Sequence, residues 1–239
     1  MSKELVNYEE RMAAMAQQAV AIERPTGASI GTRAGILTYG GKPVPNNKLD
    51  VIVVASTHFN SYYEGKYDPD NIQPPVCYAY SPDGVEMGPH PNSGKPQHTD
   101  CATCPKNQWG SGTRDGVPTK GKACKNSRVL GLVPAATKAE EMADAEVATI
   151  SLPVMSVANW STYVNKVAAL ANRPPLGVIT TIGTVPDMQS QFKITFQMGD
   201  LVDVIRLGGV FAKAEQAEPM LVREYGAPSE DAPAKNKKF

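Results

Sequence analysis

Leu49-Asp-Val-Ile-Val-Val-Ala-Ser-Thr-His-Phe59 is the most strand-like stretch of the chain, and it points to a fold built around a β-sheet. β-Branched residues fill its first half, and such side chains favour the extended backbone of a sheet. Residues 28–39 form a second strand-like segment, and the Gly-, Pro- and Asn-rich segment 40–47 between the two has the composition of a turn. The pattern therefore predicts a long hairpin of strands 28–39 and 49–59.

Short strand patterns and helical patterns follow this hairpin. Residues 75–80 predict a third strand that places Cys77 on the opposite face from Tyr78 and Tyr80. Ser156 is expected to cap the start of a helix with an apolar stripe. The other predicted elements are strands at 128–133, 147–152, 177–183 and 192–197, and helices at 3–22, 156–173 and 200–218.

The composition is that of an ordinary globular protein, with 239 residues of which 41% are hydrophobic and 20% are charged. No apolar run approaches the roughly 20 residues of a membrane helix. Charged residues also interrupt the first 25 residues, where a secretory signal would need an apolar core. We therefore expect a cytoplasmic protein without a membrane partner.

The formal net charge is zero, with 24 basic and 24 acidic residues, but the charges are unevenly distributed. From Lys95 to Arg128 there are seven basic residues and two acidic ones, so this segment has an excess of five positive charges. Three of the four cysteines lie in the same segment. A basic segment of this kind favours an anionic partner.

Cys101 and Cys104 are separated by two residues, the spacing that lets two thiolates bind one metal ion at about 2.3 Å. Cys77 and Cys124 complete a set of four thiolates. The segment 81–125 is rich in Gly, Pro, Ser, Asn and Lys and has almost no aliphatic residues with which to form a core. A structural zinc ion contributes on the order of 10 kcal/mol of folding free energy. We therefore predict that these four cysteines bind zinc.

Other uses of the cysteines fit the sequence less well. Disulfides are disfavoured by the expected cytoplasmic location, and a thioredoxin-like pair would open a helix, whereas Pro105 follows here. An iron–sulfur cluster also accepts four thiolates and stays open as an alternative. A zinc site in which His98 or His90 replaces Cys77 is also open, although we expect both histidines to be solvated loop residues.

The sequence contains no recognisable catalytic motif. Gly116-Val-Pro-Thr-Lys-Gly-Lys-Ala123 approaches the pattern of a phosphate-binding P-loop, but Ala123 stands where such a loop needs Ser or Thr to bind magnesium. The chain has three His and no Gly-x-Ser-x-Gly or His-Glu-x-x-His motif. We therefore expect a binding protein rather than an enzyme.

Aromatic residues are concentrated near the cysteines: six lie between Phe59 and Tyr80, and Trp109 lies among the cysteines themselves. Aromatic rings stack on nucleobases for about 1–3 kcal/mol per base, and neighbouring basic residues bind the phosphates. A tyrosine taken alone is equally consistent with a sheet core, and a lysine taken alone with a solvated loop. A zinc site that includes Cys124 would hold the lysines around it and Arg128 on one rigid surface. The predicted nucleic-acid-binding residues are Tyr62, Tyr63, Tyr67, Tyr78, Tyr80, Lys106, Trp109, Arg114, Lys120, Lys122, Lys125 and Arg128.

The order of elements predicts a β-rich α+β fold, and it fits an OB-fold-like Greek-key barrel with a zinc-ribbon-like insertion and flanking helices. The predicted organisation is an N-terminal helix in 1–25, an OB-fold-like domain over 26–218 with the zinc-binding insertion at about 81–125, and a flexible C-terminal tail over 219–239.

Two segments around the cysteines resemble bacteriophage-encoded single-stranded DNA-binding proteins with an OB-fold and a zinc-binding insertion: Cys101-x-x-Cys104-Pro-Lys-Asn-Gln-Trp-Gly-Ser111 and Gly121-Lys-Ala-Cys-Lys-Asn-Ser-Arg128. Ser151-Leu-Pro-Val-Met-Ser-Val-Ala-Asn-Trp-Ser-Thr-Tyr163 and Gly177-Val-Ile-Thr-Thr181 are also similar, so the resemblance spans roughly residues 28–200. It implies sequence-tolerant binding of single strands in phage DNA replication, recombination or repair, within the host cytoplasm and with replication or recombination proteins as further partners.

One departure concerns the C-terminus. Replicative single-strand binders often end in an acidic tail with a terminal Phe, whereas Phe239 follows the basic run Lys235-Asn-Lys-Lys238. Recruitment of partners through that tail therefore does not carry over. Two other functions stay open: a zinc-ribbon adaptor that binds a polymerase or another protein, and an iron–sulfur nuclease, for which we identify no carboxylate cluster.

Overall fold

The computed structural model describes residues 29–65, 68 and 72–225, together with Tyr8, Arg11, Met12 and Met15. These four residues are helical, and the rest of the helix predicted over 3–22 lies outside the described residues. Tyr67 and residues 226–239 also lie outside them.

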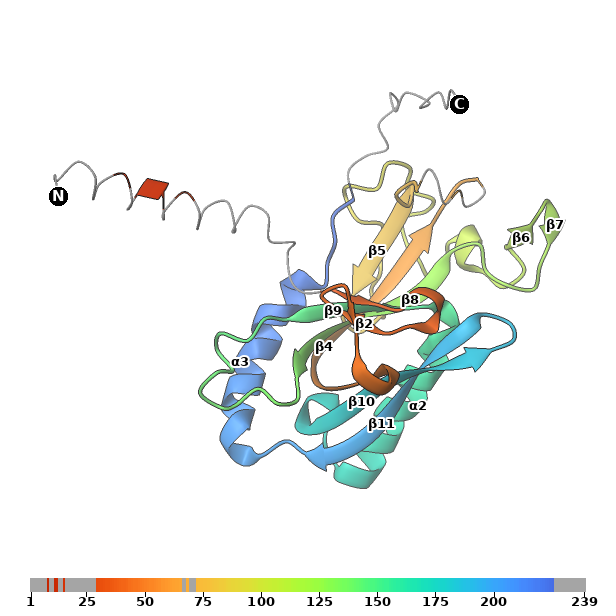
Figure 1. The fold of residues 1–239 in the computed structure, drawn as a ribbon. Helices are drawn as coiled ribbons and strands as arrows, with labels where there is room; N and C mark the ends of the chain where they lie inside the picture. Colours follow the sequence, from red (N-terminus) through yellow and green to blue (C-terminus); the bar gives the residue numbers. More distant parts are fainter. Residues whose placement is uncertain are drawn as a thin grey trace, which may run out of the picture.

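The described chain contains a six-stranded antiparallel sheet, two small sheets and two long helices (Figure 1). This confirms the predicted β-rich α+β fold. The elements are β1 (Ile30–Gly31), η1 (Arg33–Gly35), β2 (Thr38–Tyr39), β3 (Lys42–Pro43), η2 (Pro45–Asn47), β4 (Lys48–Tyr62), β5 (Cys77–Ser81), η3 (Pro105–Asn107), β6 (Thr113–Arg114), β7 (Val117–Pro118), β8 (Lys125–Pro134), β9 (Ala148–Leu152), α2 (Val154–Ala171), η4 (Pro175–Gly177), β10 (Val178–Asp187), β11 (Gln191–Leu201) and α3 (Val204–Met220).

The large sheet has the strand order β11–β10–β4–β8–β9, with β5 as an additional partner of β4. No closed barrel forms among the described strands, because β9 and β11 stay at opposite ends of this order. In the same part of the chain, no helix combines the length and the apolar character needed to cross a membrane.

Strand β4 forms the centre of the sheet, as its sequence predicts. It pairs with β8 along one edge and with β10 and β5 along the other. Val51 and Val53 pack in the same apolar cluster as Trp160 of α2, whereas Ile52 and Val54 pack in the cluster that contains residues of α3. The unbroken apolar run of β4 therefore exists because a helix covers each face of the sheet.

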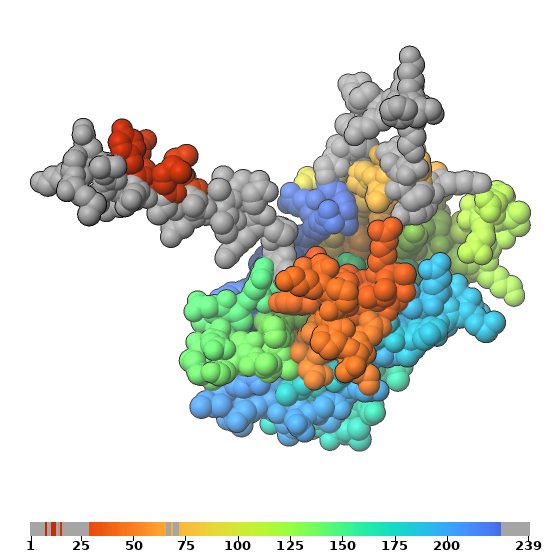
Figure 2. All heavy atoms as spheres, viewed as in Figure 1, coloured from red at the N-terminus to blue at the C-terminus, as the bar shows by residue number. Residues whose placement is uncertain are grey.

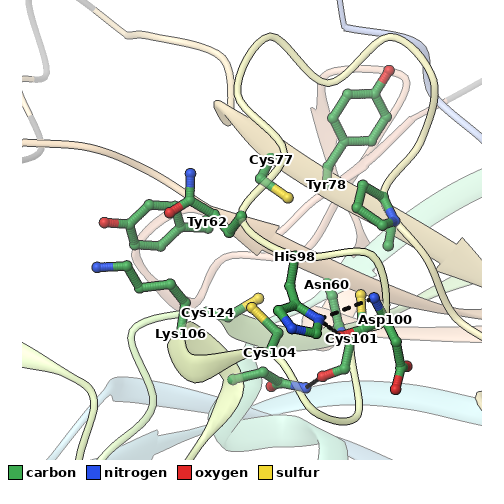
Figure 3. A pocket seen from close by; sticks show the side chains of 14 residues that line it. Asn60, Tyr62, Cys77, Tyr78, His98, Asp100, Cys101, Cys104, Lys106 and Cys124 are labelled. Carbon is green, nitrogen blue, oxygen red and sulfur yellow. Dashed lines mark hydrogen bonds between the residues drawn. The ribbon is translucent and has the colours of Figure 1, made fainter.

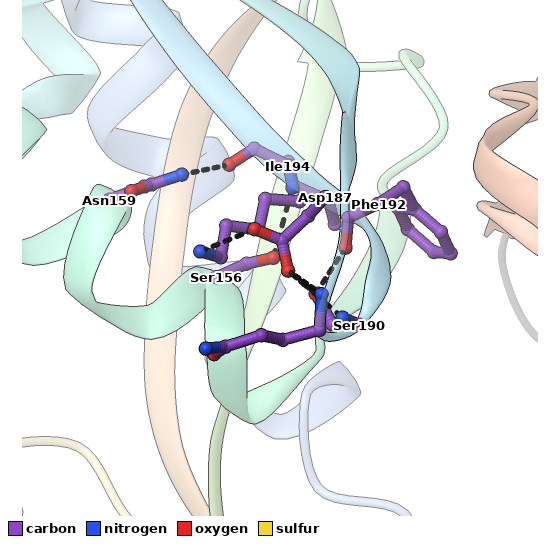
Figure 4. Close-up of polar contacts among 8 residues, drawn as sticks. Ser156, Asn159, Asp187, Ser190, Phe192 and Ile194 are labelled. Carbon is purple, nitrogen blue, oxygen red and sulfur yellow. Dashed lines mark hydrogen bonds and ion pairs between the residues drawn. The ribbon is translucent and has the colours of Figure 1, made fainter.

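Helix α2 is anchored to β11 by polar side chains (Figure 4). Ser156 is fully buried, and its Oγ accepts a hydrogen bond of 2.9 Å from Ile194 N. Asn159 Nδ2 donates to Ile194 O at 2.8 Å. Because α2 begins at Val154, Ser156 lies inside the first turn, and the prediction that it caps the helix is wrong. Its hydroxyl bonds to the sheet instead.

The predicted hairpin of strands 28–39 and 49–59 is also wrong. Only β1 and β2 form within the first segment, and they build a small sheet with β3 rather than pairing with β4. The chain turns at Ala34 and Gly35, which both have positive φ, a conformation that ends an extended strand. Asn47 holds this turn, because its Nδ2 donates to Gly35 O at 2.8 Å.

The second half of β4 carries a different set of side chains. Phe59 belongs to a third apolar cluster, together with Tyr78 of β5 and Leu221. Tyr225 stacks over Phe59 with 6.2 Å between the ring centroids. Residues 221–225, which were predicted to belong to a flexible tail, therefore pack on the sheet, and α3 itself continues to Met220.

Candidate metal centre and nucleic-acid interface

The insertion between β5 and β8, residues 82–124, attaches to the sheet through polar contacts. Lys95 N donates to Val76 O and His90 N donates to Tyr78 O, both at 2.7 Å. The buried Ser93 hydroxyl donates to Tyr78 O at 3.1 Å and accepts from Tyr78 N at 3.2 Å. Strand β5 is therefore held between β4 on one edge and the insertion on the other.

All four cysteines line one pocket formed by β4, β5 and the insertion (Figure 3). Cys77 begins β5, Cys101 and Cys104 lie in a turn of the insertion, and Cys124 directly precedes β8. Cys104 is buried, the other three are half-buried, and all four are free thiols. The fold therefore brings the predicted metal ligands together from distant parts of the sequence.

Hydrogen bonds fix the backbone around these cysteines. Asn107 Nδ2 donates to Cys101 O at 2.7 Å, and Gln108 Nε2 donates to Cys104 O at 3.1 Å. Cys124 N donates at 2.8 Å to the carbonyl of Lys106, which joins the end of the insertion to the turn that carries the other two thiols. Side-chain amides of the insertion therefore support the backbone of the turn that carries Cys101 and Cys104.

The pocket disfavours charged thiolates in the absence of a cation. Burial raises the pKa of Cys77, Cys101 and Cys124, in the last case to about 12, and the charges of neighbouring cysteines act in the same direction. Hydrogen bonds from the Gln97 backbone to Cys77 and from the Asn60 side chain to Cys101 act in the opposite direction. The thiols are thus close enough to repel each other as thiolates, and a bound cation would relieve that repulsion.

Among the described residues, no three His, Cys, Asp or Glu side chains already stand in a metal-coordinating arrangement. His98 and Asp100 line the pocket but are engaged in their own turn: Asp100 N donates to His98 Nδ1 at 3.2 Å, and Asp100 Oδ1 accepts from Ala102 N at 2.9 Å. The imidazole of His90 stacks on Tyr78, and its Nδ1 lies 2.9 Å from the Tyr78 hydroxyl. The four thiols are therefore the donors that best suit a metal here, and thiolates suit zinc.

Three lysines in or beside the insertion lie over aromatic rings. Their Nζ atoms are 5.2 Å (Lys106 and Tyr62), 5.5 Å (Lys122 and Trp109) and 5.0 Å (Lys125 and Tyr63) from the ring centroids. A cation within about 6 Å of a ring centroid is attracted by the face of the ring. We refer to these six residues as the cation–aromatic surface, and every one of them was predicted from the sequence.

Trp109 is the most exposed aromatic residue that the structure describes, with 79% of its surface accessible. It lies four residues before the start of the β6–β7 hairpin, which protrudes from the body of the molecule (Figure 2). Gly110 N and Gly112 N donate to Gly121 O at 3.1 and 2.9 Å, which ties the base of the hairpin to the segment that carries Lys122. An exposed indole beside an ammonium group is suited to stacking on a base next to a phosphate.

A chain of asparagines joins this end of the insertion to β4. Lys122 Nζ donates to Asn107 Oδ1 at 3.3 Å, and Asn126 Nδ2 donates to Asn107 Oδ1 at 2.9 Å and to Asn60 Oδ1 at 2.6 Å. These three asparagines could not be predicted from the sequence, because a single Asn carries no pattern. They meet only because the register of β4 and β8 places Asn60 opposite Asn126.

Two of the predicted stacking tyrosines belong instead to the aromatic cluster beneath residues 221–225. Tyr78 is 1% exposed, and its hydroxyl accepts a hydrogen bond of 3.2 Å from Tyr225 N. The prediction that Tyr78 stacks on a base is therefore wrong, because its ring is in the core. Tyr80 is half-buried and stacks on Phe59 at 4.6 Å, and burial raises the pKa of its hydroxyl.

The remaining predicted basic residues do not share one surface. Lys125 pairs with Ser61 and Arg128 pairs with His58, so the two basic side chains lie on opposite faces of β8. The expectation of one rigid face that includes both is therefore wrong. Lys120 and Arg114 are exposed in the insertion, whereas Arg128 is half-buried on the same face of the sheet as Asn126.

Comparisons of this chain with protein-family models, with curated proteins and with solved structures give no match.

Proposed function

We propose that this protein binds single-stranded DNA without sequence preference, through the cation–aromatic surface. The observation that carries the proposal is Trp109, which is 79% exposed and has Lys122 Nζ 5.5 Å from its ring centroid. Bases stack on such a ring whatever their identity, and the ammonium group neutralises an adjacent phosphate. Tyr62 and Lys106 repeat the same pairing on the pocket side of β4.

The proposal includes a structural zinc ion held by Cys77, Cys101, Cys104 and Cys124. Support comes from the shared pocket, from the donor set of four free thiols and from the hydrogen bonds that fix their backbone. The ion would supply folding free energy to a segment with few buried residues, and it would hold Lys106 and Lys122 in position for DNA.

The strand order supports an OB-fold-like interpretation of the domain. Apart from β5 and the insertion, which lie between β4 and β8 in the chain, strands β4, β8 and β9 pair as a meander, α2 follows β9, and β10 returns to pair with β4. This order of pairing supports a Greek-key connectivity, although β9 and β11 do not pair to close a barrel. Together with the resemblance of the cysteine segments to phage proteins, it favours a non-enzymatic role in phage DNA replication, recombination or repair.

The test is binding to a fluorescent dT oligonucleotide, measured by anisotropy at several salt concentrations. We expect the logarithm of the association constant to fall linearly with the logarithm of the salt concentration, by about 0.7 per phosphate contacted. The chain has two tryptophans, and Trp160 is 6% exposed. Stacking should therefore quench the fluorescence of Trp109, and the Trp109→Phe variant should lose this signal.

Binding that does not change with salt, or that is tighter to duplex DNA, would contradict the proposal. Capture of an acidic protein partner that survives nuclease treatment, without any affinity for dT, would favour the adaptor function instead. Iron rather than zinc in the purified protein, with visible absorbance, would point to the iron–sulfur alternative.

A further inference from the structure

Arg128 is a half-buried cation that no described acidic group neutralises. Its guanidinium donates from Nη1 to the carbonyl of Ser127 at 2.9 Å, and burial lowers its pKa. Among the described residues, no carboxylate forms an ion pair with it. Removing a charge from water without a partner is costly, so the position favours an anionic ligand.

The surroundings of Arg128 form a polar site on the pocket face of the sheet. His58 lies directly opposite Arg128 across the β4–β8 pair, and its Nδ1 has no hydrogen-bond partner among the described residues. The His58 ring also lies against Gly84, where a Cβ atom would come within 2.7 Å of it, so the ring forms a wall beneath the turn after β5.

The charge of this site comes from Arg128 rather than from His58. Burial and the charge of Arg128 lower the pKa of His58, while hydrogen bonds to the backbone of Pro82 and Ser81 and the charge of Asp83 act in the opposite direction. The lowered pKa favours the neutral form of the imidazole. A guanidinium has five N–H donors in a plane, which matches two oxygens of a phosphate group.

The site is continuous with one part of the cation–aromatic surface, the pair of Tyr62 and Lys106. Along β4, His58, Asn60 and Tyr62 point to the same face, because side chains alternate along a strand. Arg128 lies opposite His58, and Lys106 lies over Tyr62. Tyr62 lies four residues beyond His58 along β4, which corresponds to about 13 Å. The amides of Asn60 and Asn126 lie between these two positions.

We propose that Arg128 is the centre of a phosphate-binding subsite on the β4–β8 pair, where it takes a backbone phosphodiester of the same single strand whose bases stack at Tyr62 and Trp109. This inference rests on the proposed function and adds the path of the DNA. The single strand of DNA would run along the pocket face of β4, across Asn60 and Asn126. A free phosphate or polyphosphate presents the same oxygens, so the experiment separates the two sources.

The experiment compares the full-length wild type with Arg128→Gln, and uses Lys138→Gln as a control that removes the same charge from the exposed loop at the other end of β8. We expect Arg128→Gln to weaken binding to dT about tenfold at physiological salt and to make the log–log salt slope less steep by about 0.7. The control should match the wild type. Arg128→Lys should keep the slope but lose part of the affinity, because it keeps the charge without the planar pair of donors.

A second readout is the thermal stability of the same proteins with and without pyrophosphate. Pyrophosphate should raise the melting temperature of the wild type and of Lys138→Gln, but not that of Arg128→Gln. Without ligand, Arg128→Gln should melt at or above the wild-type temperature, because the substitution removes a half-buried charge that no described carboxylate pairs with.

The outcomes separate this inference from the proposed function. If the wild type binds dT and Arg128→Gln binds with the same affinity and slope, the subsite is overturned and the proposed function stands. If dT binding is absent but the pyrophosphate shift depends on Arg128, the subsite stands with a free phosphate ligand and the proposed function fails. A large drop in melting temperature for both Arg128 variants without ligand would overturn the subsite, because it would show a structural role.

Discussion

The centre of the sheet and the insertion are stabilised in different ways. In the sheet, Val51–Val54 are each at most 3% exposed and pack between two helices. In the insertion, residues 82–124, the buried residues are Met87, Ser93, Cys104 and Gly112. The sheet is therefore held by apolar burial, whereas the insertion depends on hydrogen bonds and, in our proposal, on zinc.

The largest effect is expected from removing one thiol. Cys104→Ser should release the zinc ion, and because such a site contributes on the order of 10 kcal/mol, the insertion should lose its fixed structure. The sheet should stay folded, since its core does not depend on the cysteines. Elemental analysis should show the loss of zinc, and trypsin should cut within residues 82–124 in the variant but not in the wild type.

The matched control is Ala102→Ser, which places a hydroxyl at an exposed position of the same turn. It should keep both the metal and the protease resistance. Wild-type protein without bound metal, or a Cys104→Ser variant that resists trypsin as the wild type does, would refute a metal-dependent insertion.

The complementary change is in the sheet. Leu132 is fully buried in the cluster beneath α2, and Leu132→Ala should lower the free energy of unfolding by about 2–5 kcal/mol through lost contacts and a cavity. Urea denaturation followed by circular dichroism measures this loss. The folded variant should retain its zinc. Loss of zinc from the folded Leu132→Ala variant would mean that the sheet core and the insertion are not stabilised independently.

The part of the fold that could be predicted from the sequence is the part held by apolar periodicity. The run at Val51–Val54 indicated a buried strand, and the stripe that includes Trp160 indicated α2. The predicted pairing of 28–39 with 49–59 was wrong because the first segment turns at Ala34 and Gly35, which are in the left-handed region. A hydrogen bond from Asn47 holds this turn. Such long-range polar contacts leave no periodic signal.

The candidate site, like the fold, was predictable from the sequence only in part. The spacing of Cys101 and Cys104 and the basic character of the insertion were visible in the sequence, and the four thiols share a pocket. Which tyrosines are accessible was not visible, because Tyr78 is covered by residues that lie near the C-terminal end of the chain. Asn60 and Asn126 required the strand register to be known.

A smaller effect, on binding rather than folding, is expected from Trp109→Ala. One lost stacking interaction costs about 1–3 kcal/mol, which weakens dT binding by roughly 5- to 150-fold. The melting temperature should not change, because the indole is exposed. Phe211→Ala is the matched control, since this ring is 55% exposed on α3, and its affinity for dT should equal that of the wild type. Equal losses of dT affinity in Trp109→Ala and Phe211→Ala would contradict a binding role for the exposed indole of the insertion.

The smallest effect concerns a polar contact that belongs to the sheet rather than to the insertion. Asp187 Oδ1 lies 2.7 Å from Lys193 Nζ, and Asp187 Oδ2 accepts from the Ser190 backbone and hydroxyl in the turn between β10 and β11 (Figure 4). The bond with Lys193 first, and those with Ser190 next, lower the pKa of Asp187. A lowered folded-state pKa gives stability that is present above the unfolded value, about 3.9, and is lost as the pH falls through the folded value.

Asp187→Asn should therefore lower the melting temperature slightly at pH 7, and its difference from the wild type should narrow as the pH falls below about 4. Calorimetry across this range measures the difference. Glu141→Gln, which breaks the more exposed contact with Lys138 at 3.8 Å, should have no measurable effect at any pH. If Asp187→Asn lowers the melting temperature by the same amount at every pH, the hydrogen bonds of Asp187 stabilise the turn through their geometry rather than through the charge of the carboxylate. They would then resemble the neutral hydrogen bonds that hold the insertion.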